Sequence, residues 1–187
     1  MIPAQVASLN LDQFLAQPET KPACEYRAGE IYQKPRPQGK HSYLQSELTA
    51  CINSALRQPR IARAGTELRC TFGNRSIVPD IAVFTWDKIP RDVDGSVANQ
   101  FDRAPDWTIE ILSPDQRPTR PTKNILHCLD YGCELGWFID PDDFTVFVYT
   151  PDRRTQYFDQ SGDRLPVPDF ADRLELTIQD LIDSLWD

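Results

Sequence analysis

Long apolar runs are missing from this sequence of 187 residues. No stretch approaches the roughly 18 apolar residues that a membrane-spanning helix needs. The first residues, Met-Ile-Pro-Ala-Gln-Val, also lack the basic segment and apolar run of a secretory signal. We therefore expect no contact with a membrane and a cytoplasmic location.

Cysteine is scarce, and its spacing excludes two classes of small protein. The five cysteines form an odd set without a CxxC pair, which argues against a disulfide framework and against a zinc site. The chain also lacks an internal repeat, a P-loop, a GxGxxG segment and a nucleophile elbow. A content of 40% hydrophobic and 26% charged residues is typical of a globular protein, and residues 1–187 are predicted to form one domain.

The acidic and basic residues are unevenly distributed. The net charge of −8 would repel nucleic acid, but the segment from Arg27 to Arg75 carries nine basic and three acidic residues. This segment has a balance of +6 and leaves −14 for the rest. The segment could form a basic face for a polyanion, or its charges could simply be solvated. The candidate nucleic-acid-binding residues are Lys34, Arg36, Lys40, Arg75, Arg117 and Arg120.

The apolar periodicity and the turn residues predict a chain that contains both helices and strands. Helices are expected at residues 8–16, at 41–57, from about 122, and from Thr177, where a capping box begins. Hairpins are expected at 23–33 and 135–149, and a short strand at 173–176. Two longer strands, 60–72 and 77–84, are predicted to be antiparallel neighbours joined at Gly73-Asn74. Residues 34–40 are predicted to form an exposed loop.

Two of the predicted strands each carry one carboxylate among apolar residues. Asp80 lies in the strand 77–84 and Glu110 in the strand 107–112. Side chains alternate between the two faces of a strand, so the two acids meet if the strands pair with these faces aligned. Burying two adjacent acids is costly unless cations or hydrogen bonds compensate. A bound divalent metal ion would relieve this cost.

Two further residues are weaker candidates for the same site. Glu67 could approach Asp80 from the neighbouring strand, although an edge glutamate paired with Arg69 or Arg75 is the simpler interpretation. His41 begins a predicted helix, where it could face a phosphate, but the sequence favours a solvent-exposed position.

Three blocks in this order resemble the PD-(D/E)XK nuclease superfamily and, within it, the Uma-two family of endonucleases. The blocks are Ile77-Val78-Pro79-Asp80-Ile81-Ala82-Val83, Ile109-Glu110-Ile111-Leu112-Ser113-Pro114 and Trp137-Phe138-Ile139-Asp140-Pro141. The resemblance implies a restriction-endonuclease-like α/β fold, in which a mixed sheet of four or five strands is flanked by helices, with additional antiparallel hairpins. It also implies metal-dependent cleavage of DNA.

Carried over by position, the resemblance makes Asp80 and Glu110 ligands of Mg²⁺, with the Ile111 carbonyl as a third ligand. Carboxylate oxygens suit this ion, and Mn²⁺ should substitute for it. A homodimer is expected, since cutting two strands with one site per chain calls for two copies.

The chain departs from the superfamily at the catalytic lysine, whose position two residues after the second acid is taken by Leu112. The resemblance implies that members of the narrower family supply this lysine from the helix that follows the second acid. In this chain Asn124 occupies the corresponding position. Lys123, one residue earlier, is therefore the candidate, although a shift of one residue turns a side chain by about 100° around a helix.

Three functions remain open at this point. The first is a Mg²⁺-dependent DNA endonuclease that uses Asp80, Glu110 and Lys123. The second is a nuclease-fold protein that no longer cuts and serves as a nucleic-acid-binding or assembly module, as Leu112 and the net charge suggest. The third is a hydrolase that uses the two acids as an acid/base pair on sugars.

Overall fold

The computed structural model describes residues 9–114 and 116–186. In chain order the elements are α1 Leu11–Leu15, β1 Cys24–Arg27, β2 Glu30–Gln33, α2 Gly39–Leu56, β3 Ala62–Thr66, β4 Cys70–Phe72, β5 Arg75–Ile77, β6 Ile81–Thr85, β7 Trp107–Ile111, α3 Thr119–Asp130, β8 Leu135–Asp140, β9 Thr145–Tyr149, β10 Thr155–Phe158, the 3-10 helix η1 Asp169–Ala171 and α4 Ile178–Asp183. No helix in these residues combines the length and apolar character needed to span a bilayer.

The strands form two sheets. The larger has the order β10-β9-β8-β7-β6-β3, and the smaller has the order β2-β1-β5-β4. Among the described strands, β7 and β8 are parallel neighbours linked through α3, and the other neighbours are antiparallel. This is the predicted mixed sheet flanked by helices, with six strands in place of four or five.

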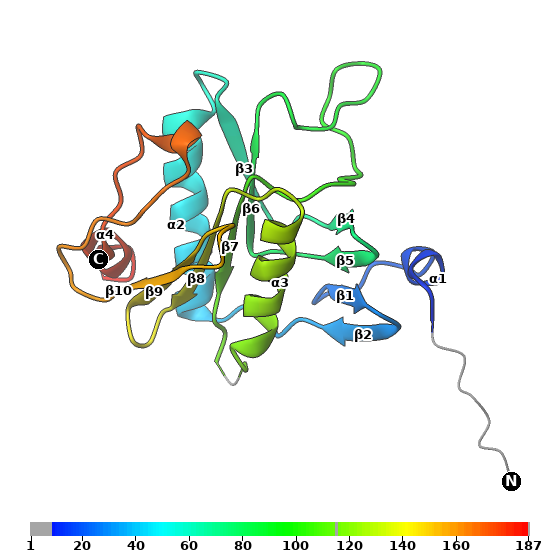
Figure 1. Ribbon diagram of the computed structural model, residues 1–187, viewed down its shortest axis with the longest axis horizontal. Helices are drawn as coiled ribbons and strands as arrows, with labels where there is room; N and C mark the ends of the chain where they lie inside the picture. The colour runs from blue at the N-terminus through cyan, green and yellow to red at the C-terminus, as the bar shows by residue number, and fades with distance from the viewer. Residues whose placement is uncertain (1–8, 115, 187) are drawn as a thin grey trace, which may run out of the picture.

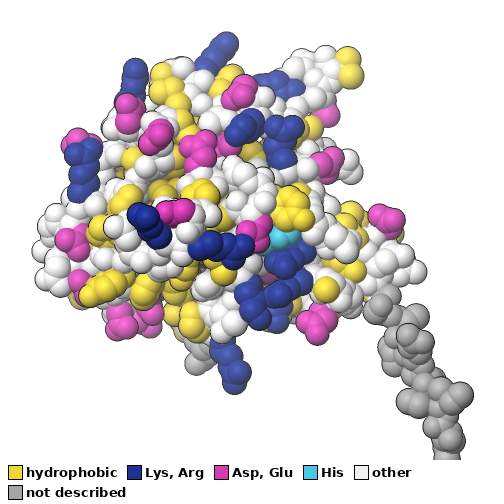
Figure 2. Space-filling model, viewed as in Figure 1, with side chains coloured by type: hydrophobic (Ala, Val, Ile, Leu, Met, Phe, Trp, Pro, Cys, Tyr) yellow, Lys and Arg dark blue, Asp and Glu magenta, His cyan; other side chains and the backbone are white. Residues whose placement is uncertain are grey.

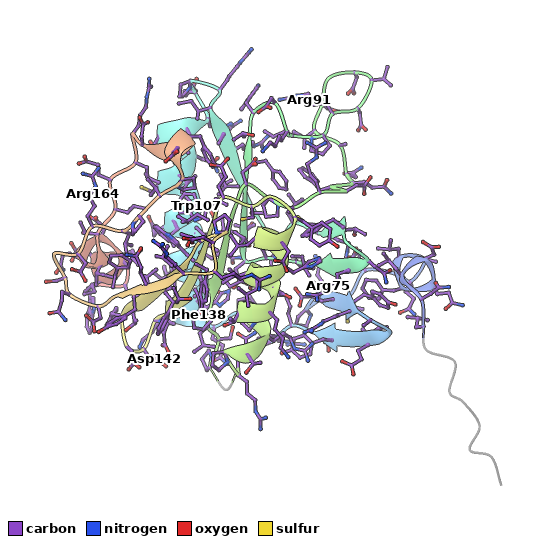
Figure 3. All side chains as sticks on the ribbon, viewed as in Figure 1. Arg75, Arg91, Trp107, Phe138, Asp142 and Arg164 are labelled. Atoms are coloured by element: carbon purple, nitrogen blue, oxygen red, sulfur yellow. The ribbon has the colours of Figure 1, made fainter. Side chains whose placement is uncertain are left out.

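Helices cover both faces of the larger sheet, with α2 on one side and α3 on the other (Figure 1). One core joins Leu44, Leu48 and Ile52 of α2 to β6 and β7, and a second joins α3 to the opposite face. Because both faces are covered, all five residues of β7 are buried, and its sequence is a nearly continuous apolar run. Trp107, at the start of β7, lies in this buried region (Figure 3). Glu110 is an unusual residue in β7 because its carboxylate is buried in the same apolar strand.

A glycine permits the close packing of α3 on the sheet. A Cβ built on Gly136 of β8 would lie 2.2 Å from Cγ2 of Ile125 in α3. The absence of that carbon fixes how near α3 approaches β8, and α3 carries several residues of the site described below.

The two longer predicted strands are each interrupted. Residues 60–72 form β3 and β4, separated at Glu67, where φ is 51°, and residues 77–84 form β5 and β6, separated at Pro79. Pro79 has no amide hydrogen to donate, and the preceding Val78 amide donates to the Glu25 carboxylate (2.9 Å) instead of to a strand. The predicted antiparallel pairing is kept in two pieces, β3 with β6 and β4 with β5.

The other element predictions are largely confirmed. Both hairpins form, and capping boxes open α1 and α4, where Asn10 and Thr177 are the N-caps. Residue 8, where the first helix was expected to begin, lies outside the described residues. The strand predicted at 173–176 is wrong: this segment has no strand, while β10, an exposed edge strand that we did not predict, pairs with β9.

Candidate active site

Four carboxylates and one lysine gather where β6 begins and β7 ends. We call this group the acid cluster, and it consists of Glu25, Lys34, Glu67, Asp80 and Glu110. Asp80 and Glu110 are 2% and 3% exposed, while the Glu67 side chain reaches solvent. The cluster draws on β1, β7 and three loop positions, so it exists only once both sheets have formed.

The pairing of β6 with β7 brings the two strand-borne acids together as predicted. Ile81 pairs with Ile109 and Ala82 with Thr108, and continuing this register places Asp80 opposite Glu110 on the same face. Asp80 also joins the strands directly, because its Oδ2 accepts a hydrogen bond from the Ile111 amide at 2.7 Å.

Lys34 lies inside the acid cluster. Its Nζ donates to Asp80 Oδ1 at 2.6 Å, to the Val78 carbonyl at 2.7 Å and to Glu67 Oε1 at 3.1 Å, so all three ammonium hydrogens have partners. The predicted loop forms at residues 34–38 and residues 36–38 are exposed, but Lys34 is not: its side chain is only 9% exposed because the acids draw it inward. Glu67 pairs with Lys34, not with Arg69 or Arg75.

The acids differ in how strongly they bind a proton. Burial by itself would raise the pKa of Asp80, but Lys34 and His41 outweigh it and hold that pKa well below its usual range. Burial, together with the neighbouring Asp80 anion, raises the pKa of Glu110 well above its usual range. Asp80 is thus the anion that the protein stabilises, and Glu110 is the acid in need of a further cation.

Asn124 links two of the glutamates. Its Nδ2 donates to Glu25 Oε1 at 3.0 Å and lies 3.3 Å from Glu110 Oε1. We did not predict Glu25, because one acid in a short hairpin strand gives no sequence signal. Burial raises its pKa, while the charge of Lys34 and the hydrogen bonds from the Val78 amide and Asn124 act in the opposite direction and compensate part of its desolvation.

His41 lies against Asp80 and is buried, contrary to the solvent-exposed position that the sequence favoured. Its Nε2 is 3.4 Å from Asp80 Oδ1, and its Nδ1 is 3.1 Å from Ser113 Oγ. One turn further along α2, Gln45 donates to the Asp80 carbonyl at 2.8 Å. The first turns of α2 therefore point at the acid, and this depends on packing that a single-sequence pattern does not reveal.

A basic pocket of about 450 Å³ opens beside the acid cluster. Asn124 and Glu25 form its inner wall, and its cations, which we call the pocket cations, are Arg27, Arg75, Arg117, Arg120 and Lys123. In the part of the chain that the structure describes, none of these five has an ion-pair partner. Figure 2 shows basic side chains gathered beside α3 on this face.

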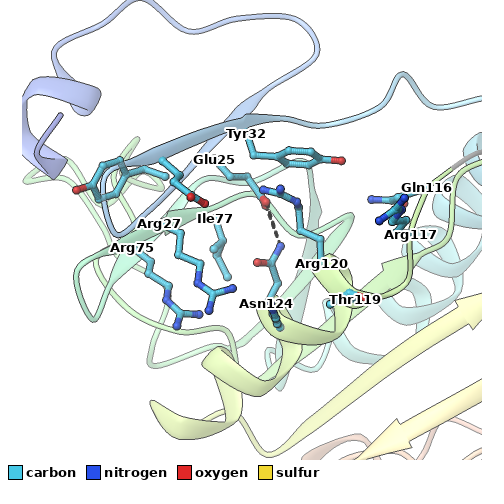
Figure 4. A pocket seen from close by; sticks show the side chains of 13 residues that line it. Glu25, Arg27, Tyr32, Arg75, Ile77, Gln116, Arg117, Thr119, Arg120 and Asn124 are labelled. Carbon is cyan, nitrogen blue, oxygen red and sulfur yellow. Dashed lines mark hydrogen bonds between the residues drawn. The ribbon is translucent and has the colours of Figure 1, made fainter. Parts of the chain in front are cut away.

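Two arginines stand next to each other in this pocket. Arg27 and Arg75 are directly paired positions on β1 and β5, and their guanidinium groups point the same way (Figure 4). Partial burial, followed by the neighbouring Arg27, lowers the pKa of Arg75. Arg120 stacks on the Tyr32 ring, with its Cζ 3.1 Å from the ring centroid. Adjacent like charges of this kind suit a polyanion, which would relieve their repulsion.

The remaining predicted residues lie farther from the acids. Lys123 is exposed on the pocket rim and, within residues 9–114 and 116–186, has no hydrogen bond or ion pair to Asp80 or Glu110. Lys123 lies one residue before Asn124 on α3, and one residue turns a side chain by about 100° around a helix. Asn124 therefore points at the acids and Lys123 points outward. Lys40 pairs with Asp142 at 2.6 Å beside a separate pocket, and Arg36 lines neither pocket.

The acid cluster suits a hard divalent cation. Mg²⁺ commonly takes one or two protein carboxylates and completes its octahedron with water and substrate oxygens. Asp80 and Glu110 are two such carboxylates, the Ile111 carbonyl remains a predicted third ligand, and Lys34 alone does not balance four carboxylates. No group of three or more His, Cys, Asp or Glu side chains is arranged around one point within the described residues, so a cage built wholly from side chains is not expected.

A mixed sheet covered by helices on both faces, with one acid on each of two neighbouring strand ends, is the arrangement of the restriction-endonuclease-like class of nuclease folds. The family model described as "Putative restriction endonuclease" (Uma2) matches residues 11–179, and the chain belongs to this family.

A solved structure supports the same assignment. The crystal structure of "a putative nuclease belonging to DUF820" from Anabaena variabilis ATCC 29413 is 59% identical to this chain, with a TM-score of 0.93. The match covers 95% of this chain and 99% of that one. A search of curated proteins found no match.

Proposed function

We propose that this protein is a metal-dependent endonuclease that hydrolyses phosphodiester bonds of DNA. The observation that carries the proposal is the adjacency of the acid cluster and the basic pocket: they share Glu25, and Asn124 in the pocket wall contacts both Glu25 and Glu110. One side of this arrangement suits a cation and the other suits a phosphate backbone, as cleavage of a polyanion requires.

In this proposal Asp80, Glu110 and the Ile111 carbonyl hold Mg²⁺ or Mn²⁺. The ion would supply a Lewis acid for the scissile phosphate and lower the pKa of a bound water. The Ile111 amide and Lys34 keep the Asp80 carboxylate oriented, and Asn124 does the same for Glu110. The pocket cations hold the flanking phosphates. Hydrolysis joins the water oxygen to phosphorus and breaks one ester P–O bond, whose oxygen leaves with a proton.

The first test is Asp80→Asn. We expect the variant to lose Mn²⁺ binding in calorimetry and to cut plasmid DNA at least about 100-fold more slowly, the cost of one preorganised electrostatic group. Asp106→Asn is the matched control, because Asp106 is also a buried carboxylate paired with a lysine, Lys88, at the other end of β7. Its stability should fall while cleavage remains. Equal Mn²⁺ affinity in the wild type and in Asp80→Asn would rule out the site.

A second function, a nuclease-fold module that binds nucleic acid without cutting it, has one observation in its favour. Both Asp80 oxygens already accept hydrogen bonds, from Lys34 and from the Ile111 amide. Metal-independent DNA binding with steep salt dependence, and no cleavage of any substrate, would select this alternative. The homodimer and the cytoplasmic location stay predictions.

A further inference from the structure

The acid cluster contains one lysine, Lys34, and it lies in the segment that we predicted to be an exposed loop. Among residues 9–114 and 116–186, Lys34 is the one lysine or arginine that forms an ion pair with a cluster carboxylate. The other positions from which a cation might be expected are Leu112 and Asn124, and neither carries a charge. Phosphoryl transfer depends on positive charge placed around the phosphate. Within the described residues, Lys34 is therefore the lysine that places such a charge beside the cluster carboxylates.

The contacts of Lys34 fix the shape of the site. Through the Val78 carbonyl the ammonium holds the backbone just before Pro79, and through Asp80 Oδ1 it holds the carboxylate that follows. Pro35 and Pro37 stiffen the chain immediately after Lys34. The lysine thus acts on both the position and the charge of Asp80.

The ammonium is also within reach from outside. A small opening lined by Pro35, His41 and Gln116 leads to Lys34 and Asp80 together. The three partners of the Lys34 ammonium, Asp80 Oδ1, Glu67 Oε1 and the Val78 carbonyl, are all hydrogen-bond acceptors, as an ammonium group requires.

We propose that Lys34 is the positioning residue of the active site: it orients Asp80 and holds a fixed positive charge beside this carboxylate. This inference rests on the proposed nuclease function. It assigns to the segment after β2 a role that we had predicted for Lys123 on α3.

The test compares Lys34→Met with a variant that returns a lysine from another direction. The Asn124 amide touches both Glu25 and Glu110, so a longer side chain in Asn124→Lys would bring an ammonium into the cluster. The variants are Lys34→Met, Lys34→Arg and the double variant Lys34→Met/Asn124→Lys. Each is measured for single-turnover cleavage at saturating Mn²⁺, for Mn²⁺ affinity without DNA, and for thermal stability.

We expect Lys34→Met to cut DNA about 100-fold more slowly while it binds Mn²⁺ at least as tightly as the wild type, because an ammonium that competes for Asp80 Oδ1 is gone. A purely structural lysine would not separate these two measurements in this way. The double variant should regain at least about tenfold in rate. Lys34→Arg should keep the stability and part of the rate. Lys88→Met is the matched control, since Lys88 pairs with buried Asp106 at 2.5 Å, and it should lose stability only.

Three results would overturn the inference. Lys34→Met could cleave DNA at a rate within threefold of the wild type, or it could lose Mn²⁺ affinity in proportion to its loss of cleavage. The third result is a double variant that folds and binds Mn²⁺ but does not regain activity. If Lys34→Met does not fold, the double variant decides in the same way. A wild type that cuts no substrate would overturn the proposed function and this inference with it, whereas an active wild type and an equally active Lys34→Met would overturn the inference alone.

Discussion

At the scale of single residues, the site depends on carboxylates whose pKa values move in opposite directions. Lys34 and His41 overcome the burial of Asp80 and lower its pKa, while burial raises the pKa of Glu110. Asp80 therefore contributes stability at neutral pH that is lost as the pH falls, and Glu110 destabilises the fold as the pH rises. A pair of this kind is costly without a bound cation, and such strain on stability is typical of functional sites.

A pH prediction belongs to His127, which lies on α3 away from the acids. Its buried ring stacks on Phe72, and burial, helped by Arg75 and Arg27 but opposed by the Phe72 carbonyl and Asp130, lowers its pKa. The unfolded chain then binds a proton more readily, so stability should fall as the pH drops through about 6.5.

We expect the loss of stability between pH 7 and pH 5 to be smaller in His127→Phe, which keeps the stacked ring. Urea unfolding at several pH values measures this change. The same pH slope in the wild type and in the variant would contradict the assignment.

At the scale of elements, α3 forms the wall between the acid cluster and the basic pocket. It presents Asn124 to the acids and Arg120 to the pocket, and its distance from the sheet is set at Gly136. A change on the far side of α3 should therefore reach the site.

Gly136→Ala tests this coupling. Its new Cβ would clash with Ile125, so we expect a loss of about 1–3 kcal/mol in the free energy of unfolding together with slower cleavage. Gly65→Ala in β3 is the control, because its Cβ would meet only Leu68 at 3.8 Å. Adding Ile125→Ala should recover part of the Gly136→Ala loss in a double-mutant cycle. Strictly additive effects would show that the predicted clash is absent.

At the scale of the whole molecule, an acidic protein carries a locally basic pocket. The net charge is −8, yet the pocket cations converge from β1, β5, α3 and the loop before α3. Arg75 lies on this side of the molecule and Arg164 lies far from it (Figure 3). Long-range repulsion and local attraction together predict binding that is sensitive to salt.

We expect Arg75→Gln and Arg27→Gln each to reduce the slope of log affinity for DNA against log salt by about 1. Arg164→Gln is the control, because Arg164 pairs with Glu175 on the opposite side. Fluorescence anisotropy with Asp80→Asn, which should not cut the probe, measures this slope. An unchanged slope in both pocket variants would place the DNA elsewhere.

The sequence by itself determined the elements with strong local signals. The periodicity of α2, the turn residues of both hairpins and the capping box of α4 are properties of neighbouring residues, and they were predicted correctly. The strand alternation around Asp80 and Glu110 likewise placed the two acids on one face. The sequence also carried the family resemblance that the comparisons confirmed.

Only the tertiary structure decided which other residues join these two acids. Glu25, Lys34 and His41 are separated from Asp80 and Glu110 by dozens of residues, and each would look like an ordinary surface group in its own segment. Their burial results from the packing of the smaller sheet and α2 against the ends of β6 and β7. Because a desolvated carboxylate draws in whichever cation the fold brings near, the identity of that cation depends on contacts that no local pattern records.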